Sequence, residues 1–428
     1  MELPQNYNPK ASEPKWESYW KEKKVFEFDS GKKGELFTID TPPPTVSGNM
    51  HIGHAFSYSQ QDFVARYKRM KGFNVYYPFG TDDNGLPTER LVEKLKGVKS
   101  TRMERPEFVE LCRKTIKEIK PDFIFDWVRI GCSCDFSKPY STIDAHCVRT
   151  SQKSFVDLYK KNLLYRRAAP SIWCVNCQTA IAQAELEDKD LPSSFSDVTF
   201  KIKNGDNITI ATTRPELLPA CVCVFVHPDD KRYRKLVGKN AIVPLFNQEV
   251  EIFADASADP EKGSGILMIC SYGDRFDVDA INRKKLEPRI CITKDGKMND
   301  YAKHFAGLSI KDARKAILEE LEAKGLLTAK KQISHVVNVH DKCGTEIEFL
   351  AAEQWFIKVM DNKEKFLEAG NKIKWHPETM KPRYDHWVEN LNWDWCISRQ
   401  RHFGVPFPVW YSKKDGSIIV ADESQLPV

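Results

Sequence analysis

The sequence predicts an α/β protein with a Rossmann-like parallel sheet, an inserted domain that is mostly β, and a Cys/His knuckle at the base of the insertion. The first observation is a loop, residues 41–51, between an apolar run that suits a strand and a pattern that suits a helix. The second is a series of short β-rich runs between residues 190 and 335. The third is a C-x2-C pair before this interval and an H-x2-C pair after it.

Length and composition are those of an ordinary globular protein. The 428 residues suffice for two or three domains, and 41% are hydrophobic and 29% charged. No apolar run approaches the roughly 20 residues that cross a bilayer, and the N-terminus lacks a signal pattern, so we expect a cytoplasmic protein with no membrane partner. The twelve cysteines should then be reduced, and close pairs indicate metal rather than disulfides.

The N-terminal part contains a predicted βαβ unit. Residues 1–34 are polar with a short aromatic helix signal, which predicts an arm packed on the core. A strand beginning at Leu36, a helix beginning at His51 and an apolar run at residues 73–79 follow in order. Ligands of such sheets bind beyond the carboxyl ends of the strands, so the loops after the two strands should lie together.

The loop before the helix has phosphate-binding chemistry. His51 and His54 are three residues apart where the helix opens, so their rings face one way, and Gly48 and Gly53 allow backbone to approach a ligand closely. Imidazole donors and the free N–H groups of a helix N-terminus both attract phosphate oxygens. The alternative is a surface turn with two unrelated histidines.

Residues 42–60, PPPTVSGNMHIGHAFSYSQ, resemble the HIGH-motif region of class I aminoacyl-tRNA synthetases, specifically the archaeal and eukaryotic valyl type. The resemblance implies ATP and Mg2+ as cofactors. It places His51, Gly53 and His54 at the ATP phosphates, with the two histidines catalytic because they stabilise the pentacoordinate phosphorus during adenylate formation.

The same resemblance implies an amino-acid site. Asp82 matches the family carboxylate that binds the α-ammonium, whereas Asp83 is equally well a helix cap. Pro42 and Pro43 would bind the amino acid, and Trp395, in a segment that matches the family's WCISRQ motif, would wall its pocket. The string DDNGLPTE that begins at Asp82 is of the valyl rather than the isoleucyl type.

Residues 90–167 are predicted to be helical, with breaks at Pro106, Pro121 and Pro139. Cys132 and Cys134 are too close in sequence to chelate a metal well, and we interpret them as structural.

The knuckle supplies three thiolates and one imidazole from Cys174, Cys177, His340 and Cys343. This set suits structural zinc, since four protein ligands leave no open position for catalysis. A chance pair or a redox pair is the alternative for Cys174 and Cys177 alone.

The interval between the two halves of the knuckle is predicted to be a compact barrel. Its β-rich runs are followed by a helix at residues 309–324, and the runs are residues 208–213, 221–226, 241–246, 250–254 and 265–270.

Residues 211–216, ATTRPE, resemble the editing insertion of the valyl, isoleucyl and leucyl enzymes. The resemblance implies a hydrolytic pocket that contains Thr212, Thr213, Arg214, Asp274 and Asp277, in which Asp277 holds the amino group. The alternative for the threonines is ordinary strand residues.

The predicted domains are residues 1–169, the arm and first part of the Rossmann catalytic domain; 170–350, the knuckle and insertion with its core at about 190–335; and 351–428, an incomplete return to the catalytic domain. A KMSKS-type loop and an anticodon-binding domain are missing from the sequence. We therefore expect a fragment, one subunit of a split enzyme that needs a C-terminal synthetase subunit, or a chain for editing alone.

The function that the resemblance implies is ATP-dependent activation of valine, transfer to tRNA(Val), and hydrolysis of mischarged Thr-tRNA(Val). The second step is needed because a hydrophobic valine site is known in this family to reject threonine only by about a hundredfold. The alternatives are a stand-alone trans-editing aminoacyl-tRNA hydrolase, a non-catalytic zinc-stabilised RNA-binding protein and, within the class, isoleucyl specificity.

Overall fold

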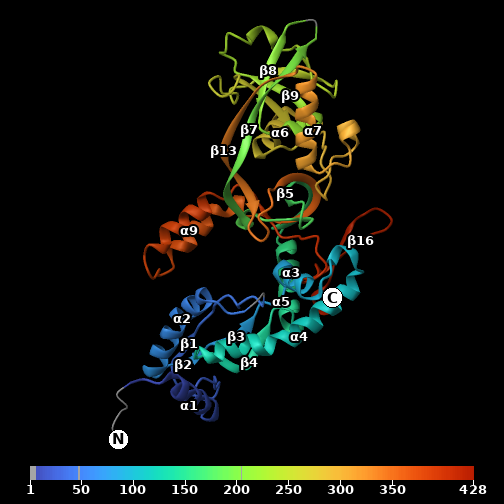
Figure 1. The fold of residues 1–428 in the computed structure, drawn as a ribbon. Helices are drawn as coiled ribbons and strands as arrows, with labels where there is room; N and C mark the ends of the chain where they lie inside the picture. The colour runs from blue at the N-terminus through green and yellow to red at the C-terminus, as the bar shows by residue number, and fades with distance from the viewer. Residues whose placement is uncertain (1–5, 47–48, 204) are drawn as a thin grey trace. The chain divides into compact units, whose positions relative to one another are not determined.

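The computed structural model describes residues 6–46, 49–203 and 205–428 (Figure 1). The chain forms two compact units, one of residues Met1–Lys161 with Arg401–Val428 and the other of Asn162–Gln400. The predicted boundaries after residues 169 and 350 remain predictions. Among the described residues, no helix is both long and apolar enough to cross a membrane.

The first unit is built on parallel strand pairs. Its first pair joins β1 (Leu36–Thr38) to β2 (Asn74–Tyr76), and its second joins β3 (Pro78–Thr81) to β4 (Asp135–Ser141). Helix α2 (Ile52–Met70) connects β1 to β2, which confirms the predicted βαβ unit. Because β2 and β3 are separated by Tyr77 alone, they act as one central strand between β1 and β4.

The remaining helices of this unit are α1 (Pro9–Glu22), α3 (Gly85–Lys96), α4 (Arg105–Arg129) and α5 (Ala145–Lys160). The predicted break at Pro121 is wrong, whereas the helices are interrupted at Pro139, although by a strand rather than a loop. Pro121 lies inside α4, where Phe108 and Trp127 bury large side chains on either side of it. Pro139 lies in β4, a strand that pairing with β3 stabilises and that helical periodicity could not indicate. A hairpin of β16 (Val409–Tyr411) and β17 (Ile418–Val420) completes the unit.

The N-terminal arm packs on the core as predicted. The Arg66 guanidinium lies 5.1 Å from the centroid of the Trp20 ring, and the N–H of Phe28 donates to Asp135 Oδ2 at 3.0 Å. Cys132 and Cys134 are buried in the core of this unit, which agrees with their structural interpretation.

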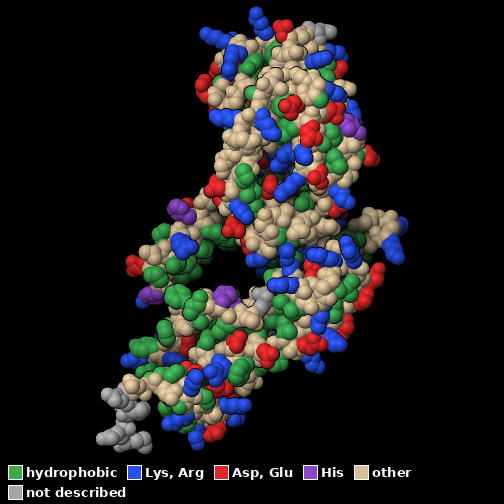
Figure 2. Space-filling view, in the orientation of Figure 1, with side chains coloured by type: hydrophobic (Ala, Val, Ile, Leu, Met, Phe, Trp, Pro, Cys, Tyr) green, Lys and Arg blue, Asp and Glu red, His purple; other side chains and the backbone are tan. Residues whose placement is uncertain are grey.

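Helix α2 has one anchored side and one exposed apolar side. On the anchored side, Asp62 accepts hydrogen bonds from the N–H and Oγ of Ser133, each at 2.6 Å. The other side carries the apolar residues whose spacing predicted the helix, and all are exposed: Ile52, Phe56, Phe63, Tyr67 and Met70. Figure 2 shows hydrophobic side chains gathered on the surface over α2. The helix is confirmed, but this apolar stripe is not buried within the described chain.

The second unit contains a seven-stranded mixed sheet. Its long antiparallel ribbon consists of β7 (Leu186–Ile202) and β13 (Leu327–His340), which Figure 1 shows as neighbouring strands. The sheet runs in the order β12, β9, β11, β10, β7, β13, and β8 also pairs with β7. The other strands are β8 (Asn207–Thr212), β9 (Cys221–Val226), β10 (Asn240–Ile242), β11 (Glu249–Ala254) and β12 (Ile266–Cys270).

Most of the predicted runs coincide with strands of this sheet, although β10 covers only the start of its run. Two helices accompany the sheet, α6 (Arg275–Lys284) and α7 (Ile310–Ala323), and α7 matches the predicted helix within two residues. The core is made of inward-facing residues from several strands, including Val198, Phe200, Ile210, Val224 and Ile252.

A four-stranded antiparallel sheet forms the rest of the second unit, in the order β15, β14, β5, β6. Residues that follow the knuckle in sequence therefore pair with the strand that precedes it. The strands are β5 (Leu164–Cys174), β6 (Thr179–Ala180), β14 (Glu348–Ile357) and β15 (Trp395–Cys396), and helices α8 (Lys363–Asn371) and α9 (Met380–Glu389) lie between β14 and β15 in sequence.

Gly80 provides a test of the packing between β3 and β4. A Cβ at this position would lie 2.1 Å from the Tyr140 ring. We expect Gly80→Ala to lower the free energy of unfolding by about 1–3 kcal/mol, because the ring must move. Chemical denaturation of Gly80→Ala, with and without Tyr140→Ala, measures this. A cost that is the same in both backgrounds would contradict the assigned contact.

Candidate functional site

The histidine pair lies at the N-terminus of α2. His51 is the N-cap residue, and its Nδ1 accepts a hydrogen bond from the N–H of Gly53 at 3.2 Å. The N–H of His51 donates in turn to Nδ1 of His54 at 3.4 Å. The two rings are stacked with centroids 3.9 Å apart. The predicted pairing of the rings on one side of the helix start is therefore present.

The environment of the His54 ring favours its neutral form. Partial burial, followed by the facing His51 ring, lowers the pKa of His54. Since Nδ1 of each ring accepts a backbone N–H, Nε2 of each ring carries a proton that can be donated to a ligand. Gly53 is needed beside His51, because a Cβ there would lie 3.0 Å from the imidazole.

Asp82 lies alongside the loop that leads to the histidines. Its N–H donates to the carbonyl of Pro44 at 2.9 Å, and its own carbonyl accepts from the N–H of Val46 at 3.0 Å. Thr142 Oγ1 donates to Asp82 Oδ1 at 2.9 Å. This short parallel bridge brings the carboxyl ends of the first two strands together, as the βαβ topology predicts.

Asp83 is a buried structural residue. It forms an ion pair with Lys120 of α4 and accepts from Thr81 Oγ1 at 3.0 Å and from Ser141 Oγ. The N-cap of α3 is Asn84, so the alternative in which Asp83 caps this helix is wrong.

The predicted amino-acid residues fall in different units. Pro42 and Pro43 line a small cleft in the first unit together with Tyr58, whose hydroxyl donates to the Pro42 carbonyl at 2.5 Å. Trp395 belongs to the second unit and is 54% exposed.

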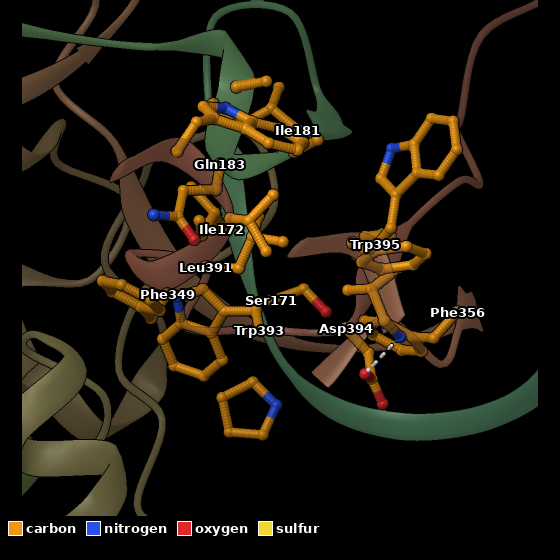
Figure 3. Close-up of a pocket in the computed structure, with 18 of the residues that line it drawn as sticks. Ser171, Ile172, Ile181, Gln183, Phe349, Phe356, Leu391, Trp393, Asp394 and Trp395 are labelled. Carbon is orange, nitrogen blue, oxygen red and sulfur yellow. Dashed lines mark hydrogen bonds between the residues drawn. The ribbon is translucent and has the colours of Figure 1, made fainter. Parts of the chain in front are cut away.

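Trp395 borders an aromatic cavity of about 390 Å³ that sequence reasoning missed (Figure 3). Its lining comes from β5, β14 and the segments around α8 and α9. The carboxylate of Asp394 is bound within the second unit. It accepts hydrogen bonds from Tyr165 Oη at 2.7 Å and from the N–H of Val359 at 3.0 Å. Of the residues that line it, only Trp395 and Cys396 belong to a predicted motif, the WCISRQ segment. Its aromatic lining residues are Phe349, Phe356, Phe366, Tyr384, Trp387, Trp393 and Trp395.

The second predicted site, in the seven-stranded sheet, centres on Arg214. Thr212 Oγ1 accepts from the N–H of Arg214 at 3.0 Å, and Arg214 Nη1 donates to the Gly273 carbonyl at 3.1 Å. The threonine strand is thus linked to the loop that carries the two aspartates. Thr213, also partly buried, lies between Thr212 and Arg214.

The two aspartates have different environments. Asp274 is the N-cap of α6 and accepts from the N–H of Asp277 at 2.8 Å, so its carboxylate is engaged in the fold. Asp277 is buried, and burial, followed by the charge of Asp274, raises its pKa well above the usual range. Perturbed carboxyl groups of this kind are frequent at functional sites.

Arg214 is a structural member of its site. Its Nη2 donates to both carboxylate oxygens of Glu348, at 2.8 and 2.7 Å, and its Nε donates to Glu216 at 3.0 Å. With both acids and the Gly273 carbonyl bound, its guanidinium is committed to protein partners. Sequence reasoning missed Glu348, because it lies on β14, far from Arg214 along the chain.

The Cys/His knuckle is assembled at the base of the β7–β13 ribbon. The four candidate ligand atoms lie within 4.8 Å of one another. Cys343 Sγ is 3.5 Å from Cys174 Sγ, 3.8 Å from Cys177 Sγ and 3.4 Å from His340 Nδ1. Ligands of a tetrahedral Zn2+ with bonds of about 2.3 Å lie about 3.8 Å apart, so these residues fit a structural metal.

Comparisons with known proteins identify the family of this chain. The family described as tRNA synthetases class I (I, L, M and V) matches residues 15–427. The chain therefore belongs to the class I tRNA synthetases.

Among curated proteins, the chain is similar to valine–tRNA ligases, which confirms the predicted resemblance to the valyl type. It is 49% identical over 417 residues to the enzyme of Thermoplasma acidophilum and 47% identical over 432 residues to that of Rickettsia prowazekii. These matches cover 97% and 100% of this chain but 52% and 53% of the relatives. The chain thus spans about half the length of the curated relatives it matches.

A solved structure, the ternary complex of Agrobacterium radiobacter K84 agnB2 LeuRS with tRNA and LeuAMS, has a TM-score of 0.46 and 18% sequence identity. The match covers 99% of this chain and 53% of that one.

If the Cys/His knuckle binds a metal, the stability of the second unit should depend on that metal. We expect purified protein to contain one zinc per chain, and Cys177→Ser to abolish it and to lower the unfolding midpoint of the second unit by about 5 °C or more, because the metal ties the base of the ribbon. Elemental analysis and calorimetry measure both. Cys147→Ser, at a half-buried thiol in the first unit, is the control and should keep the metal. Equal metal content in both variants would contradict the assigned ligands.

Proposed function

We propose that this chain carries the adenylate-forming site and the editing site of a valine–tRNA ligase. The reaction joins the valine carboxylate to the α-phosphorus of ATP with release of pyrophosphate, and then transfers the valyl group to the 3′ end of tRNA(Val). ATP is bound with Mg2+. The first unit is the HIGH-motif half of a Rossmann-like catalytic domain. The proposed location of the reaction is the cytoplasm.

One observation carries this proposal: the stacked histidines open α2, and the loop that leads to them bridges to Asp82 at the carboxyl ends of parallel strands. The Nε2–H groups of His51 and His54, left free by the backbone bonds to Nδ1, donate to phosphate oxygens as charge develops on the pentacoordinate phosphorus. Gly53 lets backbone approach the nucleotide, and Asp82 binds the ammonium group of valine. Pro42 and Pro43 wall its side chain.

Valine is the proposed substrate because the curated relatives named above are valine–tRNA ligases at 47–49% identity. The DDNGLPTE string supports the same choice over isoleucine. A non-catalytic RNA-binding protein would not require two stacked imidazoles with both Nε2–H groups available to a ligand.

We also propose that activation requires a polypeptide equivalent to the other half of the relatives. Among the described residues, β1 pairs with β2 alone. The strand order of the first unit is one half of a doubly wound sheet, in which the next strand lies on the free side of β1. Parallel sheets are covered on both faces, and the apolar stripe of α2 is exposed. The proposed partner adds a strand beside β1 and covers the stripe.

The exchange of labelled pyrophosphate into ATP tests the activation site. We expect the 428-residue chain to show very weak valine-dependent exchange that rises when the polypeptide equivalent to the other half of a relative is added. His54→Asn should then lower exchange by about 10²–10³, because a donor to the developing charge is lost.

In the same assay, Phe63→Glu should prevent stimulation by the added polypeptide, whereas Lys71→Glu, at the exposed end of the helix, should not. Full exchange by the chain alone would contradict the proposed need for a partner.

Editing is the second proposed activity of this chain, by hydrolysis of Thr-tRNA(Val). It is supported by the link from Thr212 through Arg214 to Gly273, which places the threonine strand next to the loop of Asp277. Thr212 and Thr213 orient the ester and the water, and Asp277 binds the ammonium group of the aminoacyl ester. Asp274 acts by capping α6. Structural zinc, held by Cys174, Cys177, His340 and Cys343, fixes the base of the insertion.

Deacylation of preformed Thr-tRNA(Val) tests this activity. Asp277 must be ionised to bind an ammonium group, and its pKa is raised, so the rate should increase as pH rises through that pKa. Asp277→Asn should lower the rate by about 10²-fold and remove this pH dependence. Asp279→Asn, at an exposed carboxylate of the same helix, is the control. Unchanged deacylation in Asp277→Asn would exclude the proposed role.

A further inference from the structure

A buried network of two arginines and two glutamates lies behind the proposed editing pocket. Arg214 bridges Glu216 and Glu348, and Arg314 of α7 donates to Glu216 at 2.9 and 2.8 Å. Both carboxylates are almost completely buried, whereas Arg214 retains about a quarter of its side-chain exposure. The network therefore joins three elements that are distant in sequence: the 3-10 segment Pro215–Ala220, helix α7 and strand β14.

The charge balance holds Arg214 in one orientation. Burial opposes its charge, but Glu348 and Glu216 outweigh that effect and raise the pKa of Arg214. The bond to Glu348 is bidentate through one Nη atom, and Nε faces Glu216. A planar guanidinium with these two acids fixed has little freedom left, so the direction of its remaining Nη1 is set by the network.

The Nη1 atom is directed at the editing pocket. It donates to the carbonyl of Gly273 at 3.1 Å. Gly273 lies against the Asp277 carboxylate, because a Cβ on Gly273 would lie 2.3 Å from Asp277 Oδ2. The buried carboxylate of Asp277 therefore rests against a peptide whose position depends on Arg214.

We propose that Glu348 is a positioning residue of the editing reaction: by fixing the guanidinium of Arg214, it holds the Gly273 peptide in the place that aims the Asp277 carboxylate at the ammonium group of the mischarged ester. This inference rests on the proposed editing function. It assigns to β14, outside the seven-stranded sheet, a part in hydrolysis that its sequence does not indicate.

The test is a double-mutant cycle on Thr-tRNA(Val) deacylation with the full chain. We expect Glu348→Gln to lower kcat by about tenfold, because an amide cannot accept both bonds from Arg214 and the Gly273 peptide is released. In the Asp277→Asn background the same change should lower kcat less than about twofold, since there is no carboxylate left to aim. Glu348→Asp should recover part of the rate.

A matched control and a second variant distinguish an effect on catalysis from a loss of folding. Glu353→Gln removes a carboxylate from the same strand, where it pairs with Arg166 at the surface, and should leave kcat unchanged. Arg214→Lys keeps the positive charge but cannot reach two acids and a carbonyl together, and should lower kcat like Glu348→Gln. Circular dichroism and zinc content show whether each variant is folded. If Glu348→Gln is unfolded, Arg214→Lys decides the question in the same cycle.

The outcomes separate this inference from the function on which it rests. If Asp277→Asn deacylates at the parent rate, the proposed editing role fails. If Asp277→Asn is impaired while folded Glu348→Gln and Arg214→Lys are not, or if the single effects multiply fully in the double variants, editing stands and the positioning role of Glu348 is overturned.

Discussion

The parallel alignment of the first two strands is the constraint on which the proposed activation site depends. The backbone bonds between Asp82 and residues Pro44 and Val46 bring two loops to one edge of the sheet. One loop leads into the histidine N-cap of α2, and the other carries a carboxylate. Because the N-cap geometry also fixes both Nδ1 atoms, the same short stretch determines the position of the rings and the atoms from which they donate.

In the second unit, two sets of contacts join the seven-stranded sheet to the four-stranded sheet. The β7–β13 ribbon begins and ends at the knuckle, with Leu186 opposite His340. Arg214, Glu216, Arg314 and Glu348 add a second tie, because one buried network spans the insertion and the four-stranded sheet. Two buried acids and two arginines are costly to separate, so the network favours one arrangement of these elements.

Several features of the fold could be predicted from the sequence because they are local. Helix α2 was predicted from the spacing of its apolar residues, and most strands of the seven-stranded sheet were predicted from β-rich runs. The Cys/His cluster was predicted from two short sequence pairs. β4 could not be predicted, since a proline and polar residues adopt a strand there only through pairing with β3. The exposure of the apolar stripe on α2 also could not be predicted, because periodicity identifies an apolar side but not what covers it.

The sequence by itself determined the family, the histidine pair, the candidate carboxylates and the candidate metal ligands, because each depends on residue types at short spacing. Only the tertiary structure decided that Asp83 is buried and paired with Lys120, and that Arg214 is bound to Glu348. It also created the aromatic cavity beside Trp395. The physical reason is that these roles depend on partners brought together by folding, up to 134 residues apart for Arg214 and Glu348, and no local pattern encodes such a pairing.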